Sequence, residues 1–384
     1  MHVEPFGVEE WMNTYEMKAK YNIAETCVES LTVEELLNLS GDPESAYREI
    51  CNIKLTYGEI PGSAGLRRAI ASLYESMTED NILITQGGIG ANFLAQFSLI
   101  DPGDSIISVY PTYQQLYSVP KAFGASVYLW PLRPEVGFLP DIKELKVMSK
   151  SIKHLKMICL NNPNNPTGAL MDEVFLKGVI DIARSHNAYV LCDEVYRGLE
   201  HDASYKTPSI VDLYERGIST GSMSKVFSLA GLRLGWMAGP PKVVRECFSH
   251  RNYMTISCGC IDEFLALVAM KCRNRLLGRN LQIVRENLAT LSSWIDEEKH
   301  VRWVPPSAGT TAFLDFSRYN MPSRDFCKRL LDETGAFLVP GSAFGPEFEG
   351  WARIGFACAS EVLKKGLNCV SKFLRKLERE VQIM

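Results

Sequence analysis

Short apolar runs alternate with longer segments of helical spacing between about residues 80 and 240. Segment 173–186 illustrates the helical pattern, because its apolar residues recur every three or four positions. Strands are expected at seven of the short runs, which are 81–85, 105–109, 126–130, 156–160, 189–192, 217–221 and 234–238. This repeated strand–helix–strand order predicts an α/β fold with a mainly parallel sheet between helices. In such sheets, ligands bind at the carboxyl ends of the strands.

The pattern changes in the last hundred residues, where short strands are expected at 301–304, 311–316, 336–339 and 352–357. A closing helix is expected over 360–381, and one long helix over 261–298 leads into this part of the chain. The first fifty residues contain no convincing strand. We therefore predict a large domain over 45–285 and a smaller α+β domain formed by 1–44 and 286–384.

Composition narrows the class of protein. The 384 residues are 46% hydrophobic and 22% charged, which is typical of a folded globular chain and excludes disorder and coiled coil. Lysine and arginine number 41 against 45 acidic residues, so the basic excess of nucleic-acid binders is absent. No apolar run reaches the length of a membrane span, and acids occupy the N-terminus where a secretory signal has positive charge. We expect a cytoplasmic protein without nucleic-acid or membrane partners.

The eleven cysteines do not form a metal-binding pattern. No C-x-x-C pair occurs, and the six histidines do not cluster beside the cysteines. Cys258 and Cys260 are the closest pair, but structural zinc usually takes ligands from two separated pairs. We expect free thiols and no metal.

Two polar motifs follow expected strands. Residues 162–168 read Asn-Pro-Asn-Asn-Pro-Thr-Gly, which predicts a loop. The loop is either a tight turn or a device that directs asparagine amides at a polar ligand. Asp193 and Glu194 follow the run 189–192, and buried carboxylates there require a cation. That cation is either a structural partner or a protonated nitrogen of a ligand.

Two further motifs predict phosphate binding and a nucleophile. Residues 222–225 read Ser-Met-Ser-Lys, and Arg233 follows eight positions after Lys225. A partly buried lysine can act as a Schiff-base nucleophile, and serines with an arginine can hold a phosphate. The glycine-rich segment 85–92 joins a strand to a helix, where free N–H groups attract anions. Each motif alone is weak, but together they supply what pyridoxal phosphate requires.

With these motifs the chain resembles the fold-type I pyridoxal-phosphate enzymes, specifically the class I and II aminotransferases. The resemblance covers about residues 57–356 and rests on N-P-T-G, D-E-x-Y, S-x-S-K and a downstream R-x-G in the family's order. It implies a seven-stranded sheet between helices, a smaller α+β domain and pyridoxal 5'-phosphate as cofactor. It also implies a transferase that moves the α-amino group of an amino acid to a 2-oxo acid.

The resemblance assigns roles to individual residues. It implies that Lys225 forms the Schiff base and moves the proton, and that Asp193 pairs with the pyridine N–H. The remaining implied contacts are Asn165 and Tyr196 at the phenolic oxygen, Tyr113 on the ring face, Ser222, Ser224, Arg233 and the backbone of Gly88 and Ile89 at the phosphate, and Arg353, with Asn165, at the substrate. Tyr57 is similar to a residue that family members donate to the partner's phosphate, which implies a homodimer with shared active sites.

The N-terminal segment points to a subgroup. Residues 21–27, Tyr-Asn-Ile-Ala-Glu-Thr-Cys, and the stretch 130–138 resemble capreomycidine synthases, and the first also resembles pyridoxal-phosphate arginine oxidases. Glu25 is then either a substrate-binding partner for a guanidinium group or a solvated loop acid. The alternative function is therefore a non-transaminating cyclase, oxidase or lyase that acts on an arginine-like amino acid. A transcriptional regulator is disfavoured, because the segment before Tyr57 leaves little room for a DNA-binding domain.

Overall fold

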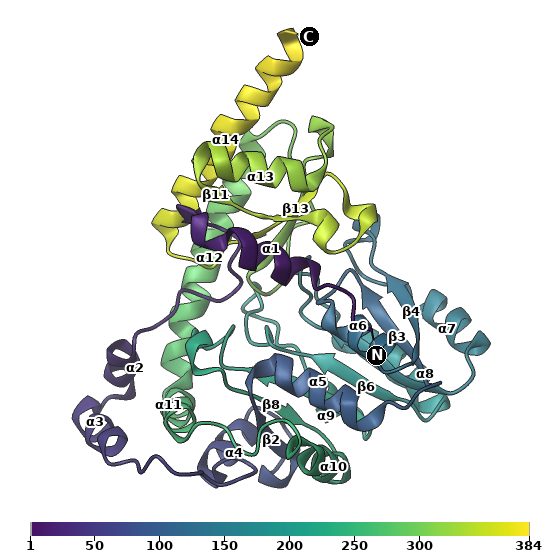
Figure 1. The fold of residues 1–384 in the computed structure, drawn as a ribbon, viewed down its shortest axis with the longest axis vertical. Helices are drawn as coiled ribbons and strands as arrows, with labels where there is room; N and C mark the ends of the chain where they lie inside the picture. The colour runs from purple at the N-terminus through teal and green to yellow at the C-terminus, as the bar shows by residue number, and fades with distance from the viewer. Residues whose placement is uncertain (1, 384) are drawn as a thin grey trace.

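A computed structural model describes residues 2–383, which form three sheets and the helices around them (Figure 1). The largest sheet has seven strands in the order β2-β8-β7-β6-β5-β3-β4. Its strands are β2 (Ile82–Thr85), β3 (Ser105–Tyr110), β4 (Ser126–Pro131), β5 (Leu155–Asn161), β6 (Tyr189–Asp193), β7 (Gly217–Ser222) and β8 (Gly235–Ala238). Only β8 runs antiparallel to its neighbours. The predicted mainly parallel seven-stranded sheet is confirmed.

Helices cover both faces of this sheet, and each face has its own hydrophobic cluster. Consecutive residues of β2 show the separation, since Leu83 belongs to one cluster and Ile84 to the other. One face packs against α5 (Gly87–Leu99), α6 (Gln115–Ala122) and α10 (Pro241–Arg251). The other face packs against α7 (Ile142–Ser151), α8 (Glu173–Ser185) and α9 (Ile210–Leu213). This two-sided burial explains why the strands read as continuous apolar runs.

The C-terminal part contains an antiparallel sheet in the order β12-β13-β10-β9. Its strands are β9 (Arg302–Trp303), β10 (Thr311–Asp315), β12 (Val339–Pro340) and β13 (Trp351–Gly355), with α13 (Ser323–Thr334) and α14 (Ser360–Ile383) beside them. The expected strand 336–339 divides, because β11 (Ala336–Phe337) pairs instead with β1 (Tyr21–Asn22). The first fifty residues therefore do contain a strand, and its partner belongs to the C-terminal part. The domain boundaries remain a prediction.

The single helix expected over 261–298 is wrong. The segment forms α11 (Cys260–Lys271) and α12 (Arg273–Glu297), which meet at Cys272. The backbone of Cys272 leaves the helical range, with φ −103° and ψ 17°. The break lets α11 pack against α2 and α4 while α12 packs against α14. No glycine or proline marks this break in the sequence.

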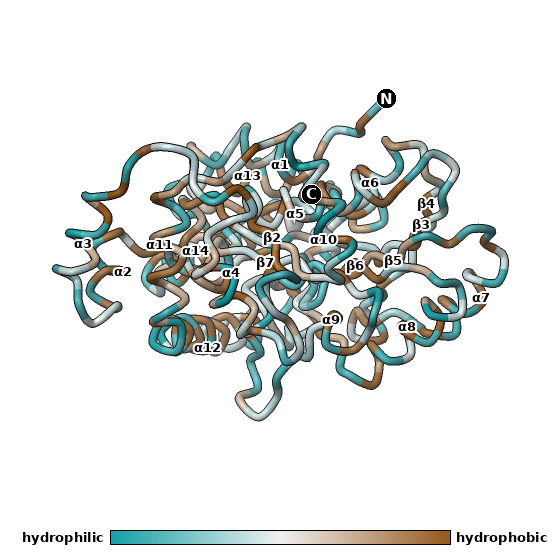
Figure 2. Tube along the Cα trace, turned by 90° about the horizontal axis from the view of Figure 1, so that it is seen from below, coloured by the Kyte–Doolittle hydropathy of each residue, from teal (hydrophilic) through white to brown (hydrophobic). Residues whose placement is uncertain are grey.

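The remaining helices belong to the N-terminal segment: α1 (Gly7–Tyr15), a 3₁₀ turn (Glu16–Lys18), α2 (Val33–Ser40), α3 (Pro43–Cys51) and α4 (Ala64–Ala71). A capping box between Thr32 and Glu35 begins α2. Figure 2 shows α2 and α3 at one end of the molecule and α7 at the other. No helix within residues 2–383 is both long and apolar enough to cross a membrane.

Candidate active site

A cavity of about 380 Å³ lies at the carboxyl ends of β6 and β7, where the N-terminal segment folds over the large sheet. Twelve of the thirteen residues expected at the site line this cavity. They are Glu25, Gly88, Ile89, Tyr113, Asn165, Asp193, Tyr196, Ser222, Ser224, Lys225, Arg233 and Arg353. The fold therefore brings together residues that are as far apart as positions 25 and 353.

Lys225 lies in the loop after β7 and extends toward the N-terminal segment. Its Nζ donates to Thr26 Oγ1 at 2.6 Å and lies 3.9 Å from Glu25 Oε1. Burial lowers the pKa of Lys225, but the surrounding Cys27, Tyr196 and Glu25 outweigh burial and raise it above the usual value. Of these three groups only Glu25 is ionised at neutral pH, so its carboxylate is the charge that favours the ammonium form of the amine.

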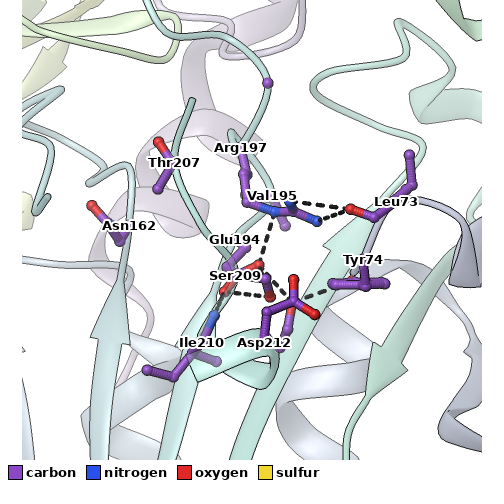
Figure 3. A network of polar contacts seen from close by, with 12 residues as sticks. Leu73, Tyr74, Asn162, Glu194, Val195, Arg197, Thr207, Ser209, Ile210 and Asp212 are labelled. Atoms are coloured by element: carbon purple, nitrogen blue, oxygen red, sulfur yellow. Dashed lines mark hydrogen bonds and ion pairs between the residues drawn. The ribbon is translucent and has the colours of Figure 1, made fainter. Parts of the chain in front are cut away.

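Asp193 and Glu194 are adjacent in sequence but have different surroundings. Glu194 faces away from the cavity into the network of Figure 3, where Arg197 Nε lies 3.0 Å from its Oε2. Ser209, Ser219 and the N–H of Ile210 also donate to Glu194. Glu194 therefore forms a structural ion pair with Arg197. This is one of the two possibilities that the sequence left open.

Asp193 faces the cavity and has no cationic partner within ion-pair distance among residues 2–383. Its Oδ2 accepts from Asn92 Nδ2 at 2.8 Å, and its Oδ1 accepts from the N–H of Val195 at 3.2 Å. Burial raises the pKa of Asp193 to about 6, although both hydrogen bonds lower it. A buried carboxylate of this kind fits a protonated ring nitrogen, which would remove the cost of its charge.

The residues expected at the phosphate lie around the N-terminus of α5. Gly88 lies in its first turn, and a Cβ there would stand 2.9 Å from Val195 Cγ1. Ser222 Oγ accepts from the N–H of Ser224 at 3.0 Å, and Arg233 Nη1 lies 3.5 Å from Ser224 Oγ. Free backbone N–H groups, two hydroxyls and a guanidinium form a cradle for a phosphate dianion.

Arg353 extends from β13 into the same cavity and is almost fully buried. Its Nη1 donates to Asn165 Oδ1 at 3.1 Å and its Nη2 donates to Ala24 O at 3.0 Å, but its Nε has no partner. Burial lowers the pKa of Arg353. An unpaired guanidinium N–H in a buried cavity fits a carboxylate ligand.

Tyr113 and Tyr196 form two walls of the cavity. The hydroxyl of Tyr113 donates to Glu9 Oε1 at 3.2 Å. Burial raises the pKa of both phenols above the usual value, so both are protonated at neutral pH.

Sequence reasoning missed the contribution of the N-terminal helix. Glu9 of α1 and Glu16 of the following turn line the cavity together with Glu25. Burial raises the pKa of Glu16, and the charges of Glu25 and Glu9 raise it further. Burial also opposes the charge of Glu25, but Lys225 and the N–H groups of Cys27 and Thr26 lower the pKa of Glu25 overall. Sequence spacing carried no signal for this cluster, because its members join only when α1 folds over the sheet. Asn92 was also missed, although it ends the glycine-rich segment already singled out.

Tyr57 is the predicted site residue that does not line the cavity. It lies between α3 and α4 in a segment that runs along the outside of the molecule, and it is 71% exposed (Figure 1). Its assignment to a partner's phosphate remains a prediction.

Comparison with known proteins places this geometry in a family. A family model for aminotransferase class I and II matches residues 40–369. The chain belongs to this family. Its members use pyridoxal 5'-phosphate, and the lysine, buried aspartate, phosphate cradle and arginine described above fit that cofactor.

Three similar proteins, one of them an aminotransferase, show which kinds of enzyme this chain resembles. A crystal structure of a PLP-dependent aminotransferase from Streptococcus suis 89-1591 has a TM-score of 0.93 and 44% identity, covering 98% of this chain and 99% of that one. Capreomycidine synthase from Streptomyces vinaceus is 32% identical over 96% of this chain and 93% of its own. The PLP-dependent cyclase OrfR has a TM-score of 0.89 and 27% identity, covering 98% of both chains. The chain is thus a pyridoxal-phosphate-dependent aminotransferase or a close relative of one.

Proposed function

We propose that the protein transfers the α-amino group of an amino acid with a cationic side chain to a 2-oxo acid. The observation that carries this proposal is the acidic cluster of Glu9, Glu16 and Glu25 in the cavity that also holds Lys225 and Arg353. A side-chain cation placed there is attracted by the carboxylates, whereas an anionic side chain is repelled by them.

The cofactor contacts follow from the geometry above. Ser222, Ser224, Arg233 and the N-terminus of α5 hold the phosphate, and Tyr113 covers the ring. Asp193 takes the ring nitrogen, and Asn165 with Tyr196 takes the phenolic oxygen. When bound, pyridoxal phosphate supplies a ring that accepts the electron pair left after the Cα–H bond breaks. Asp193 keeps the ring nitrogen protonated for this purpose.

Lys225 would hold the cofactor covalently through its side-chain amine. The same amine would act as the general base that removes the proton from Cα. Arg353 binds the α-carboxylate through its free Nε N–H and so fixes the direction of the Cα–H bond. The substrate side chain extends toward Glu9, Glu16 and Glu25.

A second candidate is a reaction that returns the cofactor unchanged, as in a cyclase, oxidase or lyase acting on an arginine-like amino acid. The 32% sequence identity to capreomycidine synthase, which extends over 96% of this chain, favours this second candidate. Both candidates begin with the same proton removal from Cα, and they differ in the bonds that change after it.

We further propose that the protein is a homodimer and that Tyr57 completes the partner's phosphate site. Leu55 and Tyr253 are 81% and 86% exposed and lie in neighbouring segments. The buried Arg251 joins these segments, because its Nη2 donates to the carbonyls of both Ile60 and Ile256. Exposed apolar side chains on fixed segments are typical of a subunit interface.

The cytoplasmic location also remains a prediction.

A half-reaction separates the two functions. The holoenzyme is mixed with arginine, lysine, citrulline or glutamate without any oxo acid, and spectra and products are recorded. Transamination predicts that arginine or lysine bleaches the cofactor and yields pyridoxamine phosphate and the oxo acid in equal amounts. Recovery of the original spectrum with a product that keeps its amino nitrogen supports the second candidate. An unchanged spectrum with every amino acid contradicts both.

A further inference from the structure

Thr26 makes the closest contact with the amine of Lys225. Its Oγ1 lies 2.6 Å from Lys225 Nζ, whereas Cys27 Sγ lies at 3.5 Å and Glu25 Oε1 at 3.9 Å. Burial raises the pKa of Cys27 to about 11, so its thiol is neutral at pH 7 and is a weak acceptor. Thr26 is therefore the principal hydrogen-bond partner of this amine.

Thr26 and Tyr196 both line the cavity together with Lys225. Burial raises the pKa of the Tyr196 phenol, while Lys225 and Thr26 lower it in part. A hydroxyl can accept from an ammonium group and donate to a neutral amine, so it can serve both protonation states of Lys225.

The surrounding structure fixes Thr26 in place. Its N–H donates to Glu25 Oε1 at 2.7 Å, and its carbonyl accepts from Thr310 Oγ1 at 2.7 Å. The residue is 6% exposed, and a β-branched side chain has few χ1 rotamers. The hydroxyl therefore has one direction, which is toward Lys225.

We propose that Thr26 is a positioning residue for Lys225. Its hydroxyl stabilises the ammonium form of the amine and orients the freed amine for the transfer of the Cα proton. This role rests on the proposed function, since it requires that Lys225 is released from the cofactor and then acts as a base.

Two rates test the role, because positioning and simple structural support change them differently. The first is capture of pyridoxal phosphate by the cofactor-free chain at pH 8. In this step the neutral Lys225 amine attacks the carbonyl carbon, a C=N bond forms and water leaves. The second is exchange of the substrate Cα–H with solvent deuterium in the holoenzyme. The variants are Thr26→Val and Thr26→Ser, and Thr14→Val on the exposed side of α1 is the control.

Thr26→Val is expected to change the two rates in opposite directions. Loss of the acceptor lowers the pKa of Lys225, so the neutral fraction and the capture rate rise by about fivefold to tenfold. Cα–H exchange falls by about 10- to 100-fold, because the freed amine is no longer oriented. Thr26→Ser is expected to keep both rates within about threefold of the wild type, since it retains the hydroxyl. Thr14→Val is expected to change neither.

Two results overturn the proposal: both rates of Thr26→Val stay within about twofold of the wild type, or both fall together, as a structural defect requires. If Thr26→Val does not fold, Thr26→Ala replaces it, and the same opposite changes are expected. A wild-type holoenzyme that exchanges no Cα–H of any amino acid contradicts the proposed function instead, and the capture rates still test Thr26.

Discussion

The two ends of the cavity differ in how the sequence encodes them. The cofactor end is built from short motifs, each at the carboxyl end of a strand of one sheet, such as Asp193 at the end of β6 and Ser222–Lys225 at the end of β7. The other end, which we propose for the substrate side chain and call the substrate end, is built by α1 and the segment after it, which carry Glu9, Glu16 and Glu25. Local motifs thus form the cofactor end, whereas long-range packing forms the proposed substrate end. The cofactor end can be recognised from sequence alone, and the substrate end requires the fold.

The largest effect is expected at the cofactor end. Lys225→Ala removes both the Schiff base and the base that moves the proton, so turnover should fall by about 10⁴-fold or more. The purified variant should also lack the absorption of covalently bound cofactor. Lys364→Ala on the exposed side of α14 is the control and should leave both unchanged. A Lys225→Ala variant that stays yellow and turns over contradicts the assignment.

Asp193→Asn tests whether the buried carboxylate serves the ring nitrogen. Turnover should fall by about 10²- to 10³-fold, because the ring loses the partner that keeps it protonated. The folded pKa of Asp193 is about 6 and its ordinary value is 3.8. A raised acid pKa means that the folded chain binds this proton more tightly, so the contribution of Asp193 to stability falls as pH rises from about 4 to 6.

The cofactor-free Asp193→Asn chain should therefore be more stable than the wild type above pH 6, by up to about 3 kcal/mol. The difference should shrink as pH falls toward 4. Denaturant unfolding at several pH values measures it. If the variant and the wild type had equal free energies of unfolding at pH 7.5, burial in the cavity would not destabilise the ionised carboxylate.

The sequence predicted the parts of the fold and site that depend on local pattern. All seven strands of the large sheet were expected, and most of them are short apolar runs because both of their faces are buried. The edge strand β4 is the exception in burial, since only Trp130 in it is fully buried. The break at Cys272 was not expected, since the two helices on either side pack against different partners and no helix-breaking residue marks the change. Glu9 and Glu16 were not expected either, because they are ordinary helical acids until α1 lies over the cavity.

Arg353→Lys tests the point where the two ends meet, since β13 brings the guanidinium between cofactor and side chain. A lysine lacks the guanidinium Nε N–H that is free to bind the α-carboxylate, so kcat/KM should fall by about 100-fold, chiefly through KM. Arg318→Lys on the surface is the matched control. An unchanged KM for Arg353→Lys would assign the carboxylate to another cation.

The smallest effect is expected at the substrate end, where three acids share the recognition of one charge. Glu16→Gln and Glu25→Gln should each lower kcat/KM for the cationic substrate by about tenfold, without changing the spectrum of the bound cofactor. Glu10→Gln on the exposed side of α1 is the control and should have no effect. Equal losses with cationic and neutral amino acids would show that these acids support the fold and do not select the substrate.

Above all, we predict that this cavity binds a positively charged substrate side chain beside the residues that act at Cα. The most direct test compares arginine with citrulline, which has nearly the same shape but no charge, by the rate of Cα–H exchange with solvent deuterium in the holoenzyme at low substrate. We expect arginine to exchange about 100-fold faster than citrulline, and the Glu16→Gln Glu25→Gln double variant to lose most of that preference. Equal rates for the two amino acids would contradict the account.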